Sequence, residues 1–156
     1  MVPACEAAMS EHVSLIDLND VYKIGIDSID REHRYLIDLY NDLAQKVVFG
    51  TTTMQLNTAV DKLFDYAAQH FASEERLMWV TGFPNIESHK FQHESFVHTL
   101  TELVGQQQNK DDATALRQLA VFVGRWIRGH ILISDKAFGE FISGRDEQAE
   151  PDRKTT

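Results

Sequence analysis

Cysteine and proline are scarce in this chain, and each shortage excludes some classes of protein structure. The single cysteine, Cys5, cannot form an internal disulfide or supply thiolate ligands for a metal cluster. A lack of disulfides suits a reducing compartment, so we expect a cytoplasmic protein. Only three prolines and eight glycines occur among 156 residues, and few helix breakers are therefore present.

Long apolar runs and excess positive charge are missing as well. No apolar run is long enough to cross a bilayer, so no membrane insertion is expected. The formal net charge of −9 argues against nucleic-acid binding, because phosphates require a basic surface. The first eight residues lack the charged and apolar regions of a signal peptide.

Apolar residues recur at three- and four-residue steps in four stretches, which predicts four amphipathic helices. The stretches run over residues 29–47, 56–78, 86–104 and 116–142. Helix-capping candidates precede three of them: Asp27 or Ser28, one of Thr51, Thr52 and Thr53, and Asp111 or Asp112. Short connections force neighbouring helices to run antiparallel. We therefore predict an all-α, up-down-up-down four-helix bundle.

The chain divides into three predicted regions around that bundle. Residues 1–20 form an N-terminal extension, expected to be partly disordered or a loop. Residues 21–143 form the bundle, and residues 144–156 form a charged C-terminal tail that we expect to fray.

Seven polar residues occupy inward positions of the four apolar stripes. Burying so many ionisable groups without partners would cost several kcal/mol or more, so the core must provide something that pairs with all of them. A metal cluster in the core satisfies this requirement. The seven residues are His33, His70, Glu74, His89, His93, His130 and Asp135.

The spacing of these residues supports a shared site. His70 and Glu74 are four residues apart, as are His89 and His93, so each pair points the same way on successive helical turns. His130 and Asp135 are five apart, about 140° round an ideal helix. They share a direction only if the backbone bends or forms a π-bulge. We predict a local distortion there.

The number and type of side chains indicate two metal ions. Five imidazoles and two carboxylates are too many for one tetrahedral zinc. Imidazole suits iron, zinc, copper or nickel, and carboxylates can bridge two ions. The Glu-x-x-His pairs of ferritin-type bundles are missing. A zinc-protease reading fails because His93-Glu94 is followed by His98, one residue too far.

Other polar residues on these helices have plainer interpretations. His12 and His98 are interpreted as structural histidines rather than ligands, because His12 lies in the N-terminal extension and His98 lies off the ligand turn of the third helix. Glu75, Glu87 and Glu94 are interpreted as solvated charges on helix faces.

Taken in order, these motifs resemble the hemerythrin family. They are His33, His70-Phe71-x-x-Glu74-Glu75, His89-x-x-x-His93 and His130-Ile131-x-x-x-Asp135-Lys136. Ile29-Asp30-x-x-His33 and Trp126-Ile127-x-x-His130-Ile131 resemble its bacterial branch in particular. The resemblance extends over about Val21 to Ile142.

The resemblance implies a non-haem centre of two iron ions. One ion would be held by His89, His93 and His130, and the other by His33 and His70. Glu74 and Asp135 would bridge the ions together with an oxo or hydroxo group. The ion with two histidines would keep an open position for dioxygen.

The resemblance further implies reversible dioxygen binding, for transport, storage or delivery, rather than catalysis. Leu36, Trp126 and Ile127 are candidate walls of an apolar oxygen pocket, although plain core packing explains them equally well. Two alternatives stay open. One is an oxygen or redox sensor that acts through a signalling partner, and the other is a di-iron enzyme with peroxidase-, nitric-oxide- or ferroxidase-type activity. An oxygen-consuming enzyme is a possible partner of a carrier. Nothing in the sequence fixes an oligomeric state.

Overall fold

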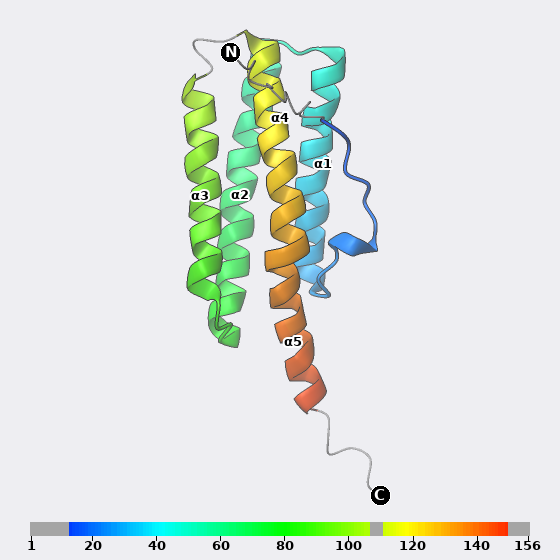
Figure 1. Cartoon of the computed structure of the whole chain (residues 1–156), viewed down its shortest axis with the longest axis vertical. Coiled ribbons are helices and arrows are strands. Elements are labelled where there is room, and N and C mark those ends of the chain that lie inside the picture. Colours follow the sequence, from blue (N-terminus) through cyan, green and yellow to red (C-terminus); the bar gives the residue numbers. More distant parts are fainter. Residues whose placement is uncertain (1–12, 107–110, 150–156) are drawn as a thin grey trace, which may run out of the picture.

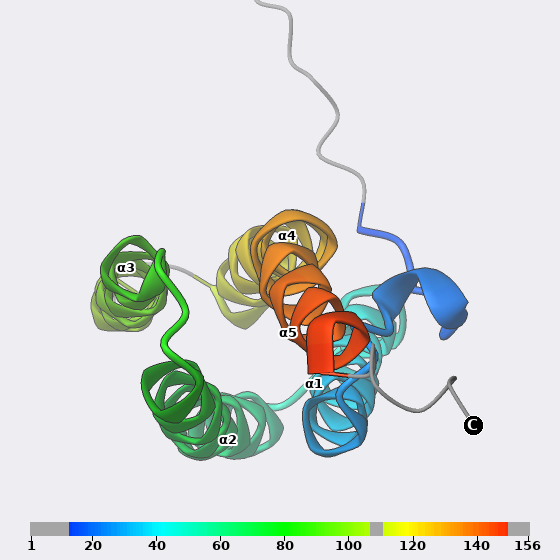
Figure 2. The same ribbon diagram turned by 90° about the horizontal axis from the view of Figure 1, so that it is seen from below.

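Helices packed in antiparallel order make up the structure, a computed structural model that describes residues 13–106 and 111–149 (Figure 1). Each of the four principal helices packs against the next in the chain, and the last also packs against the first (Figure 2). The predicted all-α four-helix bundle is confirmed. The helices are α1 (Asp27–Phe49), α2 (Thr53–Thr81), α3 (Ile86–Gly105) and α4 (Asp112–Gly129).

The fourth helix does not end with α4. It continues through a π-helical segment, η3 (His130–Asp135), into α5 (Lys136–Ala149), which extends past the end of the other helices (Figure 1). The distortion predicted between His130 and Asp135 is thus confirmed. Helical structure also reaches beyond residue 142, where the apolar pattern ends.

Side chains cap two helices as the sequence predicts. The Thr52 hydroxyl accepts a hydrogen bond from the Gln55 amide, and the Gln55 side chain accepts one from the Thr52 amide, which is a reciprocal capping box. Asp111 accepts hydrogen bonds from the amide and the hydroxyl of Thr114 at the start of α4. Gly82 ends α2 in the left-handed conformation (φ +69°).

The capping prediction for the first helix is wrong. Asp27 and Ser28 are already helical, and the residue before them makes no side-chain capping hydrogen bond. The Asp30 carboxylate instead accepts from the amides of Ile24 and Gly25, at 2.7 and 3.2 Å. Gly25 has a φ of +85°, which turns the chain so that both amides face the first helical turn.

The segment before α1 lies along the bundle in extended conformation with one short 3-10 helix, η1 (Asp20–Tyr22). Asn41 holds it with two hydrogen bonds to the backbone of Ile16, and the Tyr40 hydroxyl donates to the carbonyl of Ser14. The structure describes only part of the predicted N-terminal extension, and the proposed domain boundaries stay predictions. His12 and residues 150–156 lie outside the described part.

Two apolar clusters fill the bundle on either side of the polar residues. The larger one occupies most of the length of α1, α2 and α4 and contains Leu36, Leu56, Leu116 and Ile127. The smaller one closes the end where α5 begins, and it consists of Ile24, Ile29, Met78, Phe83 and Phe138. Within the described ranges, no helix is long and apolar enough to span a membrane.

Gly139 marks a close contact between α5 and the segment before α1. A Cβ at this position would overlap the carbonyl oxygen of Ile24 and lie 2.9 Å from its Cβ. We expect Gly139→Ala to lower the free energy of unfolding by about 1–3 kcal/mol, as overpacking typically does. Urea unfolding measures the change.

Gly144, in the same helix, is the matched control, because a Cβ there would meet nothing within 4 Å. Gly144→Ala should stabilise the protein by up to about 1 kcal/mol through helix propensity alone. If both substitutions stabilised the protein equally, the inferred close contact between Gly139 and Ile24 would be wrong.

Candidate metal centre

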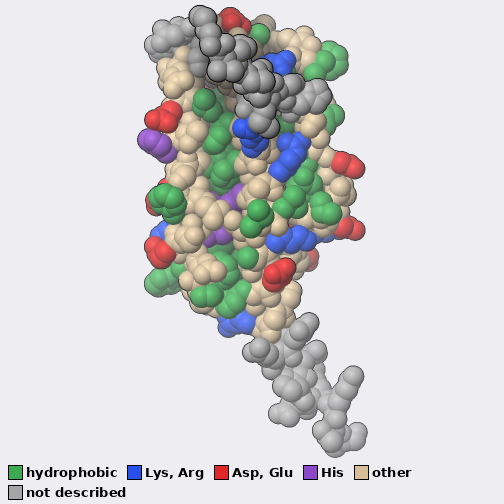
Figure 3. Space-filling model, in the orientation of Figure 1, with side chains coloured by type: hydrophobic (Ala, Val, Ile, Leu, Met, Phe, Trp, Pro, Cys, Tyr) green, Lys and Arg blue, Asp and Glu red, His purple; other side chains and the backbone are tan. Residues whose placement is uncertain are grey.

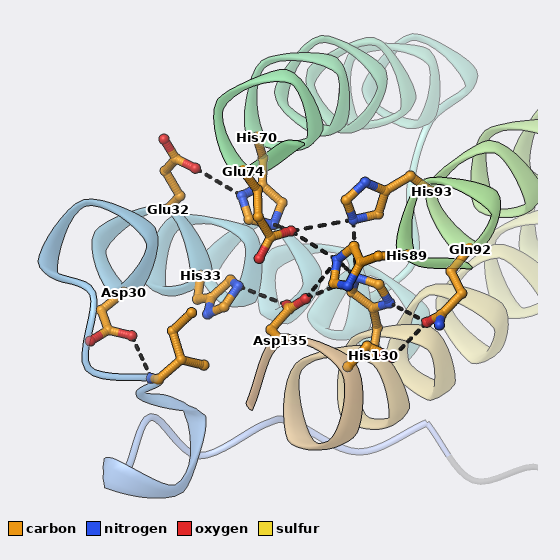
Figure 4. A network of polar contacts seen from close by, with 12 residues as sticks. Asp30, Glu32, His33, His70, Glu74, His89, Gln92, His93, His130 and Asp135 are labelled. Atoms are coloured by element: carbon orange, nitrogen blue, oxygen red, sulfur yellow. Dashed lines mark hydrogen bonds and ion pairs between the residues drawn. The ribbon is translucent and has the colours of Figure 1, made fainter. Parts of the chain in front are cut away.

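The structure brings all seven predicted polar residues together in the bundle interior (Figure 4). Each is almost completely buried, with at most 4% of its surface exposed. Their potential ligand atoms fall into two groups that share both carboxylates. One group contains Glu74, His89, His93, His130 and Asp135; the other contains His33, His70, Glu74 and Asp135.

The three-histidine group is tightly convergent. The Nε2 atom of His130 lies 3.0 Å from Nε2 of His93 and 3.1 Å from Nε2 of His89. One Asp135 oxygen lies 3.0 Å from the same His130 nitrogen, and a Glu74 oxygen lies 3.2 Å from that of His89. Ligand atoms about 2.1 Å from a common ion at right angles would be about 3 Å apart. The spacing therefore fits donors arranged around one ion.

The two-histidine group contains polar atoms that satisfy no hydrogen bond. His33 Nε2 lies 3.0 Å from Asp135 Oδ2, and His70 Nε2 lies 3.9 Å from Glu74 Oε2. The first distance is short, but its angles are not those of a hydrogen bond. Buried polar atoms without partners are costly. These donors accordingly fit a metal ion, which would satisfy them all.

The π-helical segment explains how the fourth helix supplies two of these side chains. In an α-helix, residues five apart point in different directions. The wider turn of η3 instead brings His130 and Asp135 to the same face, where Asp135 reaches both groups. The local departure from α-helical geometry therefore positions a shared carboxylate.

Burial and neighbouring charges shift the pKa values of several residues in the group. Burial opposes ionisation of Asp135, yet the neighbouring imidazoles of His130, His33 and His89 hold its pKa well below the usual value. Burial likewise opposes protonation of His89, but Asp135 and Glu74 outweigh it and raise the pKa of His89 to about 9. For His130, burial dominates and lowers the pKa.

Three histidines make a hydrogen bond through Nδ1, on the side away from the cluster. With Nε2 directed at the centre, the Nδ1–H group of His70 donates to Glu32 at 2.8 Å, and that of His93 donates to Glu75 at 2.9 Å. His130 donates to the amide oxygen of Gln92 at 2.9 Å. Such bonds fix ring orientation and tune the basicity of a ligand.

Sequence reasoning missed these outer partners, and for one residue it was wrong. Glu75 is not a freely solvated charge, because it bonds to His93 and its side chain is only 27% exposed. Glu32 and Gln92 each adjoin a ligand candidate in sequence, which is the only signal that pointed to them. His98 is exposed and lies 3.4 Å from Glu102, so it is not part of the centre.

The three predicted pocket residues lie in different places. Leu36 and Ile127 are fully buried in the larger apolar cluster. Trp126 is partly buried and stacks on His130, with ring centroids 4.2 Å apart. Its ring also lies 6.3 Å from His93, so the candidate ligands that Trp126 contacts belong to the three-histidine group.

The bundle and its buried donors match a family model described as a Hemerythrin HHE cation binding domain, over residues 24–142. The chain belongs to the hemerythrin family. Hemerythrin domains bind non-haem iron, and proteins of the family are mainly oxygen-binding rather than catalytic. The predicted family is therefore confirmed.

Several curated hemerythrins are similar over most of their length. A bacteriohemerythrin of Stenotrophomonas maltophilia is 32% identical over 87% of both chains. One of Pseudomonas aeruginosa is 31% identical, covering 79% of this chain and 78% of the relative. A myohemerythrin of Riftia pachyptila is 27% identical over 72% of this chain and 82% of the relative.

Removing the outer carboxylates should weaken metal binding. Glu32→Ala and Glu75→Ala leave the Nδ1 atoms of His70 and His93 without their charged acceptors. We expect each variant to bind iron about 10- to 100-fold more weakly, measured by competition with a chelator. Glu94→Ala, an exposed neighbour of His93, is the control and should not change the affinity. Unchanged affinity in all three would show that the outer bonds do not support the centre.

Metal-free protein should lose stability as the pH rises from 6.5 to 9. The folded pKa of His89 is raised to about 9 from 6.5, so its contribution is complete below pH 6.5 and disappears above pH 9. The lowered pKa of His130 changes the free energy of unfolding only below pH 6.5, so it cannot offset this loss at higher pH. Urea unfolding should show a falling free energy of unfolding across this window. A shallower fall is expected in His89→Gln, and a flat or rising wild-type curve would refute the coupling.

Proposed function

We propose that this hemerythrin domain holds two iron ions and binds dioxygen reversibly, as a carrier, storage or delivery protein. One observation carries the proposal: two groups of buried donors share the same two carboxylates, Glu74 and Asp135. A pair of shared carboxylates is suited to a pair of ions rather than to two separate sites.

The donor sets assign a different role to each ion. His89, His93 and His130 would hold one ion, and His33 and His70 the other, with Glu74, Asp135 and an oxo or hydroxo group as bridges. The ion with fewer histidines would keep a free position for dioxygen. Two ferrous ions in this site would supply the two electrons that reversible dioxygen binding requires.

Apolar side chains pack on two sides of the centre. Leu36 and Ile127 are buried on one side, and the smaller cluster with Met78 and Phe138 covers the other. A dry, apolar surrounding protects a reactive centre from hydration and proton leakage. We propose Leu36 and Ile127 as walls of the oxygen pocket. Trp126 is not included, because its ring contacts lie at the three-histidine group.

Metal analysis combined with optical spectra tests the proposed function. The anaerobically reduced protein is examined before air, after air and after the gas has been removed, over many cycles. We expect two irons per chain and a charge-transfer absorption that appears and disappears with the gas. Rapid conversion to a stable oxidised spectrum would favour a sensor or an enzyme instead, and protein without iron would overturn the assignment.

A truncation at the pocket wall should accelerate oxidation of the centre. Leu36→Ala opens space within the larger apolar cluster, beside the turn that carries His33. We expect oxidation in air several-fold faster than in wild type, because water reaches the centre more readily. The rate is followed as loss of the oxygenated spectrum.

Leu56→Ala is the matched control for this experiment. Leu56 is equally buried in the same cluster, but it lies in the first turn of α2, far along the helix from His70. Both substitutions should cost about 2–5 kcal/mol in stability. Only Leu36→Ala should oxidise faster, and identical rates in the two variants would contradict a pocket role for Leu36.

A further inference from the structure

A groove with aromatic walls runs between α3 and the fourth helix, immediately outside the three-histidine group. Its volume is about 540 Å³, within the range of small-molecule sites. Phe91 and Ile133 stand on its sides with 68% and 72% of their surfaces exposed. Figure 3 shows hydrophobic and histidine side chains gathered along this junction. Exposed apolar surface next to a buried polar centre is unusual enough to suggest binding.

Stacked rings connect the groove directly to the centre. Trp126 and His130 both line the groove, and their rings stack at 4.2 Å with an angle of 14°. Phe96 lies 4.4 Å from Trp126, and Phe122 lies 5.3 Å from Phe96 in a stacked arrangement. A flat ring in the groove would therefore be separated from a candidate metal ligand by one aromatic side chain at most.

Polar groups at the groove converge on the same histidine. Gln92 lines the groove and accepts hydrogen bonds from His130 Nδ1 at 2.9 Å and from the Ser134 hydroxyl at 2.6 Å. The acceptor on His130 is thus a neutral amide, whereas His70 and His93 have carboxylates. The groove meets the centre at the histidine whose outer partner carries no charge.

We propose that this groove binds a flavin nucleotide, which in its reduced form restores the oxidised centre to the ferrous state. Phe91, Phe122 and Trp126 line the groove with exposed or partly exposed aromatic rings, which suits a flat conjugated ring. Hydroxyl and amide groups suit its polar edge, and Arg125 places a positive charge on the lining, matching the nucleotide phosphate. Phe96 also borders the groove, but it is only 1% exposed and packs against Trp126.

The proposed reduction of the centre rests on the proposed function. A reduced flavin gives up two electrons and two protons, becomes oxidised flavin and converts two ferric ions to ferrous. The protons pass to solvent. A dioxygen carrier needs such a reaction, because an oxidised centre no longer binds dioxygen.

Equilibrium binding is the first test, with the iron-loaded full chain and oxidised flavin mononucleotide as the probe. Stacking on Trp126 should quench the fluorescence of the flavin in a saturable way. Ser95→Trp fills the groove and Phe91→Ala removes an exposed wall, so each should weaken binding about tenfold, equivalent to about 1.4 kcal/mol. Phe91→Ala keeps the test decisive if Ser95→Trp folds poorly. Thr101→Trp, exposed on the same helix, is the control and should bind normally.

Reduction kinetics provide the second test. Reduced flavin mononucleotide should reduce the oxidised centre with a rate that saturates in wild type and Thr101→Trp. In the groove variants the rate at low flavin should fall about tenfold, in proportion to the weaker binding. Dithionite, a small inorganic reductant, should reduce all four proteins equally.

The two tests separate this proposal from the proposed function. The groove assignment would be overturned if the flavin fluorescence were not quenched and reduced flavin reduced the centre of all four proteins at the same rate, without saturation. Reversible dioxygen spectra in the same samples would leave the carrier function standing. Saturable binding that the groove variants do not weaken would also overturn the assignment, because the flavin would then bind elsewhere.

Discussion

The burial of seven ionisable side chains in one apolar core is the constraint on which the rest of the structure depends. Neither the larger nor the smaller apolar cluster could stabilise a charged Glu74 or Asp135 beside unpaired histidines. The bundle therefore packs its apolar clusters on either side of these groups and directs all seven toward one another. The proposed pair of metal ions, shared by the two carboxylates, would satisfy the ligand atoms that hydrogen bonds leave unpaired.

Asymmetry around the centre gives each side a different chemical character. On the two-histidine side, Leu36 packs in the larger apolar cluster, and His33 also lines a cavity of about 530 Å³ that has charged side chains on its walls. The three-histidine side is bordered by Trp126 and leads to the aromatic groove. Carboxylates support His70 and His93, whereas an amide supports His130. In the two proposals, dioxygen binds on the two-histidine side and electrons arrive on the three-histidine side.

Periodicity was sufficient to predict the helices, the two well-defined caps and the convergence of the seven residues. It also predicted the distortion at η3, because residues five apart can share a site only on a widened turn. Periodicity did not predict Asp30 as the support of the first helix, since that role depends on the positive φ of Gly25. It also failed for Glu75, whose bond to His93 is made between two helices. Contacts between helices depend on how each helix is rotated about its axis and on how closely the two helices pack, and the pattern of a single helix does not specify either.

The most direct test of the central claim is a crystal structure of the iron-loaded protein with anomalous scattering measured at the iron edge. The account predicts two anomalous peaks in the bundle core, each contacted by both Glu74 and Asp135, with three histidines at one peak and two at the other. A single peak, or two peaks that do not share the carboxylates, would contradict it.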